Sequence, residues 1–460
     1  MRTAAAVGAG RAVAFLSRRL RLGGGTTLPG AVAHRIDPHL PEKMASRLSR
    51  GSVLITGTNG KTTTSRLLSS ILRQAGLRTV HNRSGANLLT GVTSALVNAS
   101  DWLGLPRGDI GVFELDEAVL PQAVARLRPR AVVVTNLFRD QLDRYGEIDH
   151  IARLWRQALA SLAPASTAVL NADDPLVASL AASTGAQVVY YGIQDQRCGL
   201  PGEQHAADSK RCHACGAAYD YEVIYYGHVG HYACPACTSA RPCPAVYAEA
   251  VTLQGTAGSE IAVHLPQGSL SLSVPLPGLY NVYNALAALA CSASLGIPTP
   301  ALQRGVESFS AAFGRVERIN IRGRQVFLAL VKNPVGFNEV LRTLFLDDVA
   351  KDLLIVINDN VADGTDVSWL WDVDFELLRG KVRSVVVSGT RAEDMLLRLK
   401  YAGVDMGRSS LEKDLRAALI HSLAHVADGQ TLYVLPTYTG LLAIRQVIQQ
   451  MGCVGAFWRD

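Results

Sequence analysis

Short apolar runs alternate with helix-like segments along most of the chain from about residue 51. The segment TTTSRLLSSILRQAG (62–76) has the spacing of an amphipathic helix. The runs that predict buried strands around it are SVLIT (52–56), IGVFELD (110–116), RAVVVTNL (130–137) and STAVLNADD (166–174). Strands that alternate with helices indicate a mostly parallel sheet with crossover helices. We therefore expect an α/β domain over residues 51–314.

This rhythm breaks between about residues 198 and 245, where the chain is rich in Cys, His, Tyr and Gly. We interpret this stretch as an insertion, after which NVYNALAALACSASLGI (281–297) predicts a helix. A second α/β unit follows, with apolar runs at 353–357, 382–388 and 431–436. The pattern predicts a C-terminal Rossmann-like domain over residues 315–460.

The first 50 residues form a basic segment with helical character. Six arginines precede the first acidic residue, Asp37, and several of them interrupt or follow the apolar run instead of preceding it. That order does not fit a secretory signal. Three interpretations remain: a helix that packs on the protein, a helix that rests on anionic lipid, or a targeting signal.

Composition narrows the class of protein. A chain of 460 residues has room for two or three domains, and 48% apolar with 18% charged residues is ordinary for a globular protein. The net charge of +6 is too small to indicate nucleic-acid binding. No apolar stretch is as long as the roughly 18 residues that a membrane-spanning helix requires. The eight cysteines do not suggest a disulfide scaffold, and we expect a cytoplasmic protein.

The strongest local signal is a phosphate-binding loop in SVLITGTNGKTTTSRLL (52–68). A predicted strand enters a loop of Gly57, Thr58, Asn59 and Gly60, and a helix begins near Lys61. Backbone N–H groups of such a loop bind phosphate oxygens at the helix N-terminus. Lys61 would reach the β- and γ-phosphates of ATP. The loop is a shortened variant, because Ile55 stands where the usual spacing requires glycine, and a purely structural glycine turn is the alternative.

Two residues are candidates for holding Mg²⁺ beside this loop. The Thr62 hydroxyl follows Lys61, where P-loops place a magnesium ligand. Glu114 ends a predicted strand in VFELDEA, where a second ligand would stand. An acidic residue at the end of a strand is often an ordinary solvent-exposed side chain. The neighbouring phosphate-binding loop favours a role for Glu114 as a magnesium ligand.

Two CxxC pairs stand within the insertion. The sequence CHACGAAYDYEVIYYGHVGHYACPAC (212–237) matches a four-thiolate zinc ribbon. Four cysteines leave no open coordination position, so we predict a structural Zn²⁺. Cys243 lies nearby and complicates the ligand set, and we interpret His213, His228 and His231 as ordinary surface histidines. The expected zinc ligands are Cys212, Cys215, Cys234 and Cys237.

Several motifs together resemble a known family. GTNGKTTT, FELDE, TNLFRDQLDRYGE, LNADDP, GLYNVYNALAALA and GRVE resemble, in order, the ATP-binding motifs of the Mur ligase central domain. The zinc insertion and the segment ADGTDVSW (362–369) are similar to the MurT family, the Mur ligase-like subunits of lipid II isoglutaminyl synthase. The resemblance covers the chain from about residue 25 to its end.

The resemblance implies a reaction and its partners. ATP would activate the α-carboxylate of D-glutamate in the lipid II stem peptide as an acyl phosphate, and ammonia would convert it to D-isoglutamine. It also implies adenine or ribose contacts at Asn281 and Asn284 and a phosphate-side contact at Arg315. An NxxN pair at a helix start is also an ordinary packing feature.

Two departures from the amino-acid-adding Mur ligases bear on the substrate. Those enzymes usually carry histidine where this chain has Gln141, which leaves a second metal site open. They also tend to carry histidine before Asn333-Pro334, where this chain has Lys332. Both departures suggest that the nucleophile is not an amino acid.

Ammonia would then come from a separate glutaminase. Cys198, Cys243, Cys291 and Cys453 lack the surroundings of an activated nucleophile. The resemblance implies a class I glutamine amidotransferase subunit, GatD, as partner in a heterodimer.

The acidic stretch NDNVADGTDVSWLWD (358–372) is the candidate contact with that partner. The resemblance places at Asp366 a carboxylate that completes the partner's Cys-His pair. Asp359 and Asp363 compete for this role, or all three cap helices and loops. Trp369 and Trp371 suit an interface or a core.

Two other functions compete with this interpretation. One is an amino-acid-adding ligase of the Mur or folylpolyglutamate type that acts without a partner. The other is a zinc-ribbon protein that binds nucleic acid or serves as a scaffold. No Lys or Arg lies between Cys212 and Cys237, which argues against nucleic acid.

Overall fold

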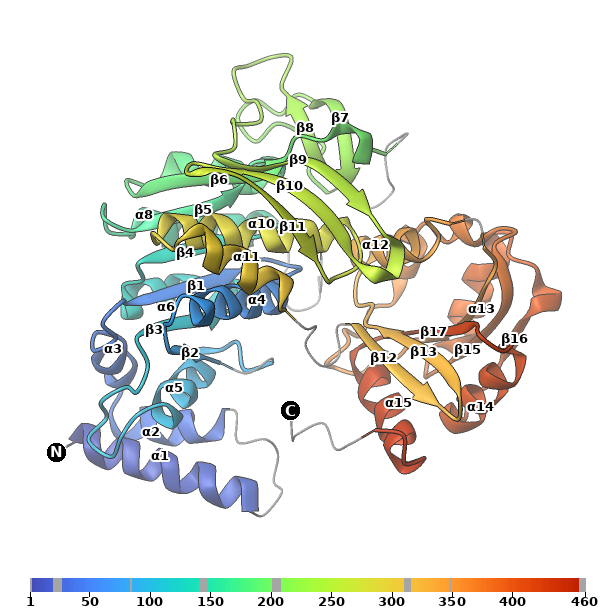
Figure 1. Ribbon diagram of the computed structural model, residues 1–460, viewed down its shortest axis with the longest axis horizontal. Coiled ribbons are helices and arrows are strands. Elements are labelled where there is room, and N and C mark those ends of the chain that lie inside the picture. The colour runs from blue at the N-terminus through green and yellow to red at the C-terminus, as the bar shows by residue number, and fades with distance from the viewer. Residues whose placement is uncertain are drawn as a thin grey trace.

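The computed structural model describes residues 2–19, 27–82, 85–139, 148–200, 208–309, 316–347 and 349–454. Two α/β units lie side by side, with three helices at the N-terminal end (Figure 1). Those helices are α1 (Arg2–Arg19), α2 (Leu28–Ile36) and α3 (Leu40–Ala45). Buried Ala6 and Val7 of α1 join the core of the first unit, so this basic segment packs on the protein.

The first unit is built on a nine-stranded sheet of order β11-β10-β9-β6-β5-β4-β1-β3-β2. From β2 to β9 neighbouring strands are parallel, whereas β9, β10 and β11 pair antiparallel. The strands are β1 (Ser52–Thr56), β2 (Thr79–His81), β3 (Ile110–Glu114), β4 (Ala131–Val134), β5 (Thr167–Asn171), β6 (Gln187–Ile193), β9 (Val246–Leu253), β10 (Ser259–Leu265) and β11 (Gly268–Val274).

Helices cover both faces of this sheet. Successive residues of β1 face opposite cores, because Val53 and Ile55 pack with α4, α10 and α11, while Leu54 packs with α5, α6 and α8. Burial on both faces explains why the parallel strands are continuous apolar runs. The helices are α4 (Lys61–Gln74), α5 (Leu89–Asn98), α6 (Leu120–Leu127), α8 (Ile148–Ala160), α9 (Pro175–Ser179), α10 (Leu279–Ser294) and α11 (Thr299–Glu307).

The inserted stretch contains a two-stranded hairpin, β7 (Asp220–Tyr226) and β8 (Val229–Ala233), at the upper edge of the molecule in Figure 1. Both CxxC pairs flank this hairpin. The chain then returns to the main sheet through the antiparallel strands β9 to β11, which the sequence pattern did not predict.

The second unit has a six-stranded sheet of order β12-β13-β17-β14-β15-β16, parallel except for the hairpin β12–β13. Its two faces form separate cores, one with α12 and α13 and the other with α14 and α15. The predicted α/β architecture is therefore confirmed. The elements are β12 (Val316–Ile321), β13 (Arg324–Ala329), α12 (Pro334–Leu344), β14 (Lys351–Val356), β15 (Val382–Ser388), α13 (Ala392–Tyr401), β16 (Ser409–Leu411), α14 (Leu415–His425), β17 (Thr431–Pro436) and α15 (Tyr438–Gln450).

Candidate active site

The loop between β1 and α4 requires glycine at two positions. Gly57 and Gly60 have φ of 138° and 88°, in the region that favours glycine. A Cβ on Gly57 would lie 2.0 Å from Thr135 Oγ1, and one on Gly60 would lie 2.0 Å from Asn284 Oδ1. The loop is thus packed against the segment that follows β4 on one side and against α10 on the other. This close packing fixes the loop directly before the N-terminus of α4, where an anion is stabilised.

The segment that leaves β4 holds the loop in place. Thr58 N donates to Asn136 O at 3.0 Å, and Asn59 N donates to Asn136 Oδ1 at 2.9 Å. Phe138 N donates to Thr58 Oγ1 at 2.9 Å. Asn136 and Phe138 belong to the TNLF segment (135–138), which begins one of the motifs that resemble the ATP-binding motifs of Mur ligases, although no role was predicted for either residue. The sequence signal for these roles is the polar pair Thr135-Asn136 directly after the buried strand β4.

Lys61 is buried beside the loop and is paired with a carboxylate. Its Nζ lies 2.6 Å from Glu117 Oε1 and also donates to Gly57 O and, at 3.2 Å, to Thr58 O. Burial raises the pKa of Glu117, although Lys61 and Lys332 oppose this shift. Glu117 was not predicted, even though it follows Glu114 and Asp116 in the same acidic segment.

Thr62 and Glu114 lie together, as a divalent-ion site requires. Thr62 Oγ1 donates to Glu114 Oε1 at 2.9 Å. The other oxygen, Glu114 Oε2, is buried and has no hydrogen-bond partner among the described residues. A buried carboxylate oxygen without a partner is costly, and a Mg²⁺ ion would satisfy it. The residues present therefore fit this ion.

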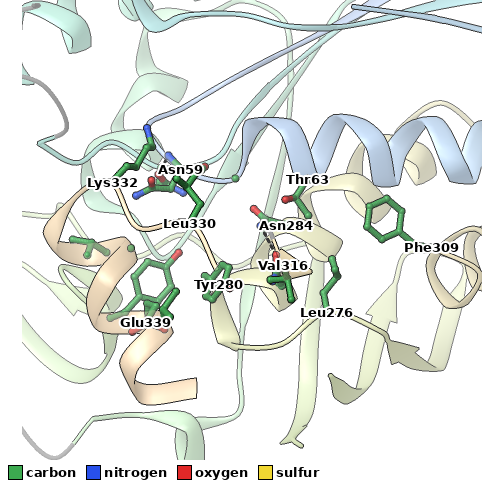
Figure 2. Close-up of a pocket in the computed structure, with 17 residues that line it drawn as sticks. Asn59, Thr63, Leu276, Tyr280, Asn284, Phe309, Val316, Leu330, Lys332 and Glu339 are labelled. Atoms are coloured by element: carbon green, nitrogen blue, oxygen red, sulfur yellow. Dashed lines mark hydrogen bonds between the residues drawn. The ribbon is translucent and has the colours of Figure 1, made fainter. Parts of the chain in front are cut away.

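A pocket opens between the phosphate loop, α10 and α12 (Figure 2). Asn281 and Asn284 line it from α10, and Asn284 Nδ2 donates to Asn281 Oδ1 at 3.0 Å. The two asparagines predicted to contact adenine or ribose thus share one wall with the phosphate loop. Apolar surface is supplied by Leu276, Tyr280, Phe309, Val316 and Leu330.

The C-terminal unit completes the loop's surroundings. Lys332 Nζ lies 3.5 Å from Thr58 O, and Asn333 Nδ2 donates to Asn59 Oδ1 at 3.0 Å. Asn333 Oδ1 also caps α12 by accepting from Gly336 N at 2.9 Å. A second cation therefore lies beside the phosphate loop, at one of the two positions where the sequence departs from the amino-acid-adding ligases.

The four cysteines of the insertion converge. Their sulfur atoms lie within 4.8 Å of one another, with Cys212 Sγ 3.5 Å from Cys237 Sγ and Cys215 Sγ 3.4 Å from Cys234 Sγ. Tetrahedral Zn²⁺ with Zn–S bonds of about 2.3 Å separates its sulfur ligands by about 3.8 Å. The four thiols fit this ion, and Cys243 is outside the cluster.

Two of the three histidines in the insertion are not on the surface. His228 and His231 are 1% and 8% exposed, whereas His213 is exposed. The surface interpretation was therefore wrong for His228 and His231. His231 Nε2 lies 2.8 Å from Ile193 O, on β6. Both histidines face the main sheet because the hairpin folds back onto it.

Asp366 is exposed in the stretch after β14. Its Oδ1 accepts a hydrogen bond from Ser368 N at 2.8 Å, and contact with Ser368 lowers the pKa of Asp366. The carboxylate is thus ionised near neutral pH and accessible to another chain.

The two competing aspartates are engaged within the C-terminal unit. Asp359 forms an ion pair with Arg391 at 2.7 Å. Asp363 is buried and accepts from Thr439 N at 2.8 Å and from its hydroxyl at 2.5 Å. Both carboxylates stabilise the conformation of the loop after β14. Asp366 is therefore the most accessible of the three aspartates.

Two predicted features lie outside the described residues: Arg315 and the segment Asp140–Asp143 that contains Gln141. The two tryptophans of the acidic stretch differ in exposure. Trp369 packs near Phe337 in the core, whereas Trp371 is 51% exposed.

Comparisons with known proteins agree with this architecture. Residues 55–222 match the Mur ligase middle domain, and residues 330–441 match the MurT ligase C-terminal domain. A pseudomurein peptide ligase type C from Methanothermus fervidus superimposes with a TM-score of 0.68 at 23% identity, over 88% of this chain and 79% of that one. The predicted Mur ligase fold is thereby confirmed.

Two curated relatives cover nearly the whole chain. The lipid II isoglutaminyl synthase (glutamine-hydrolyzing) subunit MurT of Staphylococcus aureus (strain COL) is 33% identical over 91% of both chains. The subunit of that name from Streptococcus pneumoniae (strain ATCC BAA-255 / R6) is 31% identical over 96% of this chain and 95% of its own. The prediction that the chain is similar to subunits of a glutamine-hydrolysing ligase is therefore confirmed. The chain belongs to the MurT family of Mur ligase-like proteins.

Proposed function

We propose that the protein amidates the α-carboxylate of D-glutamate in the lipid II stem peptide, at the expense of ATP, to give D-isoglutamine. The relatives named as lipid II isoglutaminyl synthase subunits support the substrate. The observation that carries the proposal is the unpartnered Glu114 oxygen beside Thr62 at the phosphate loop. It indicates a site built for a metal-bound nucleotide.

The reaction follows from the groups at the loop. A carboxylate oxygen of the substrate attacks the γ-phosphorus of ATP, which gives an acyl phosphate and ADP. Ammonia then attacks the acyl carbon, the C–O bond to phosphate breaks, and the proton lost from nitrogen is taken up by the leaving phosphate. Lys61 and Lys332 stabilise charge on the transferred phosphoryl group. Thr62 and Glu114 would hold Mg²⁺, which neutralises charge on the phosphates when bound.

The nitrogen comes from a partner subunit, a class I glutamine amidotransferase of the GatD type. Burial raises the pKa of Cys198 to about 11 and that of Cys291 to about 12, so neither thiol is activated as a glutaminase nucleophile. Asp366 is exposed and ionised, as a carboxylate that orients a partner's histidine must be.

The zinc ribbon has a structural role in this proposal. Cys212, Cys215, Cys234 and Cys237 would hold Zn²⁺ with four thiolates and leave no position for substrate. The ion would supply folding energy to a hairpin that has only a small core of its own.

The lipid substrate requires that the protein work at a membrane surface, and we place it at the cytoplasmic face. Phe15 and Leu16 of α1 are 57% and 52% exposed. Trp102 and Leu103 are 64% and 68% exposed, and the Arg11 guanidinium lies 4.3 Å from the Trp102 ring. No acidic residue occurs in α1. Exposed aromatic and aliphatic groups beside arginine suit an anionic lipid surface.

None of the helices within the described ranges is long and apolar enough to cross a membrane. Co-sedimentation with phosphatidylglycerol vesicles tests the surface contact. The full-length chain should bind these vesicles, and Trp102→Ser combined with Leu103→Ser should weaken binding. Equal recovery of both proteins with the vesicles would contradict this contact.

Isotope transfer tests the reaction itself. Lipid II carrying ¹⁸O in the D-glutamate α-carboxylate is amidated with ATP and ammonium, and the released phosphate is analysed by mass spectrometry. An acyl phosphate requires that one ¹⁸O atom pass to phosphate. Unlabelled phosphate, or a product that forms only with an added amino acid, would contradict the proposal.

A further inference from the structure

The turn of the zinc-ribbon hairpin is buried, which is unusual for the turn of a β-hairpin. Tyr226 and His228, on either side of Gly227, are 3% and 1% exposed. At the other end of the hairpin Cys234 directly follows β8, and its zinc-site neighbour Cys215 is exposed. The turn of the ribbon is therefore buried in the main domain, whereas at the metal-binding end Cys215 is exposed and Cys212 and Cys234 are buried.

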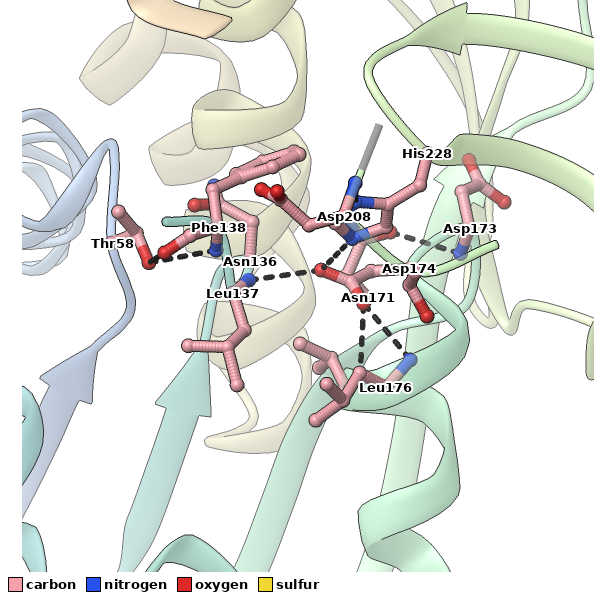
Figure 3. A network of polar contacts seen from close by, with 12 residues as sticks. Thr58, Asn136, Leu137, Phe138, Asn171, Asp173, Asp174, Leu176, Asp208 and His228 are labelled. Atoms are coloured by element: carbon pink, nitrogen blue, oxygen red, sulfur yellow. Dashed lines mark hydrogen bonds and ion pairs between the residues drawn. The ribbon is translucent and has the colours of Figure 1, made fainter. Parts of the chain in front are cut away.

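His228 reaches the polar network that Figure 3 shows. Its Nε2 lies 3.5 Å from Asp174 Oδ2, and both side chains are almost fully buried. Asp174 Oδ2 accepts a hydrogen bond from Leu137 N at 2.9 Å. The His228 ring also lies 4.5 Å from the Phe138 ring. The imidazole thus contacts the segment that leaves β4 directly and through Asp174.

That same segment holds the phosphate loop. Phe138 N donates to Thr58 Oγ1 at 2.9 Å, and Thr58 Oγ1 donates to Phe138 O at 3.1 Å (Figure 3). Asn136 binds the neighbouring Asn59 backbone on both sides, through Oδ1 at 2.9 Å and Nδ2 at 3.1 Å. A displacement of Phe138 would therefore move Thr58 and the loop.

Tyr226 reaches the nucleotide pocket itself. It is one of the residues that line the pocket, and its ring packs 5.9 Å from Phe138 and 5.4 Å from Tyr283. Tyr283 stands on α10 between the two pocket asparagines. The hairpin thus supplies part of the pocket wall and supports the helix that forms another part.

The exit of the ribbon is tied to the same helix. Arg241 Nε lies 2.5 Å from Asp173 Oδ1, and Tyr283 OH donates to Asp173 Oδ2 at 2.7 Å. Asp173 and Asp174 are consecutive and fully buried. One of them connects the ribbon to α10, and the other connects it to the phosphate loop.

We propose that the zinc-ribbon hairpin is a positioning element of the nucleotide site, with His228 acting through Asp174 and Phe138 on Thr58 and Tyr226 forming pocket wall. The inference rests on the proposed function in that ATP is the nucleotide bound at this loop. It gives the insertion a role in nucleotide affinity in addition to its own folding.

Substitution of His228 tests the inference. His228→Ala should raise the Kd for a magnesium complex of a non-hydrolysable ATP analogue about tenfold, because it removes the buried ring that packs on Phe138 and lies beside Asp174. The KM for ATP in the ammonium-dependent reaction should rise in parallel, with kcat changed less than about threefold. His228→Gln retains a polar group near Asp174 and should recover part of the affinity.

A matched control removes another histidine of the same domain. His264 lies on β10, is partly exposed and stacks on Tyr247, away from the loop. His264→Ala should bind the analogue as wild type does. Wild-type affinity for His228→Ala with unchanged zinc content would overturn the inference, whereas failure of the wild-type protein to bind the analogue would instead overturn the proposed function.

Hydrogen exchange on the wild-type chain gives a second readout that does not depend on a variant. Removal of zinc by a chelator should speed amide exchange at 57–60 and 135–138, and leave α14 in the other unit unchanged. Faster exchange confined to 208–240 would show that the ribbon does not support the loop and would overturn the inference.

Discussion

Glu339 provides a pH-dependent test of how the pocket is built. It stands on α12, lines the nucleotide pocket and is 4% exposed. Its Oε1 accepts from Arg342 Nη1 at 2.6 Å, and Arg342 also lies 3.4 Å from Asp374. Burial raises the pKa of Glu339 from 4.5 to about 7, although Arg342 opposes the shift.

The sign of the effect follows from proton counting. Between pH 4.5 and pH 7 the folded protein keeps the Glu339 proton, whereas the unfolded chain has lost it. Because the unfolded chain binds fewer protons, the free energy of unfolding falls as pH rises through this window. Each pKa unit corresponds to about 1.4 kcal/mol, so the full shift of Glu339 lowers the free energy of unfolding by about 3 kcal/mol. Above pH 7 the loss is complete.

Glu339→Gln removes the titrating group and keeps its shape. Wild type should lose about 2.5 kcal/mol of unfolding free energy relative to this variant between pH 5 and pH 8, because part of the titration of the unfolded chain is already complete at pH 5. Urea unfolding followed by tryptophan fluorescence is a suitable assay. The Trp369 ring lies 6.4 Å from the ring of Phe337, which stands on α12 together with Glu339.

The matched control is Glu376→Gln, which removes a carboxylate that is 49% exposed and paired with Arg398. Solvent screens this pair, so its pH-dependent difference should be small. A difference for Glu339→Gln that does not vary with pH would refute the reasoning, because the buried carboxylate would then carry no cost of ionisation.

Three further predictions concern the ATP site and the zinc ribbon. Cys215→Ser should reduce bound zinc, measured by mass spectrometry of the metal, to well below one ion per chain, and full retention would contradict the four-thiolate site. Asp173→Asn should destabilise the first unit by roughly 3 kcal/mol in chemical denaturation, because the Arg241 side chain, only 11% exposed, loses its carboxylate partner; an unchanged midpoint would argue against that pair. Glu114→Gln should lower kcat/KM for ATP roughly 100-fold at saturating Mg²⁺, and near-normal turnover would exclude Glu114 as a metal ligand.

The parts of the molecule that sequence predicted best are those that local chemistry dictates. The glycines at 57 and 60 require backbone angles that other residues avoid, so strand, loop and helix could be inferred from adjacent residues. Cys212 and Cys215, with their later counterparts, could be paired because two-residue spacing brings thiolates together. In each case the decisive contacts lie within a few residues or follow a fixed spacing.

The residues that were missed depend on contacts between distant segments. Glu117 pairs with Lys61 only because β3 lies next to β1 in the sheet. Lys332 reaches the phosphate loop across the two units, over 274 residues of sequence. His228 was interpreted as an ordinary surface histidine, and no neighbouring residue in the sequence shows that the turn of the hairpin is buried. Tertiary packing decides all three.

The central claim is that this chain performs the ATP-dependent amidation while a glutaminase partner supplies ammonia. The most direct measurement is the rate of lipid II amidation by the complex with glutamine and then with ammonium, for wild type, Lys61→Ala and Asp366→Asn. We predict that Lys61→Ala loses both activities, and that Asp366→Asn loses glutamine-dependent activity but keeps ammonium-dependent activity. Amidation by Lys61→Ala at the wild-type rate, or equal rates from both nitrogen sources in Asp366→Asn, would contradict the account.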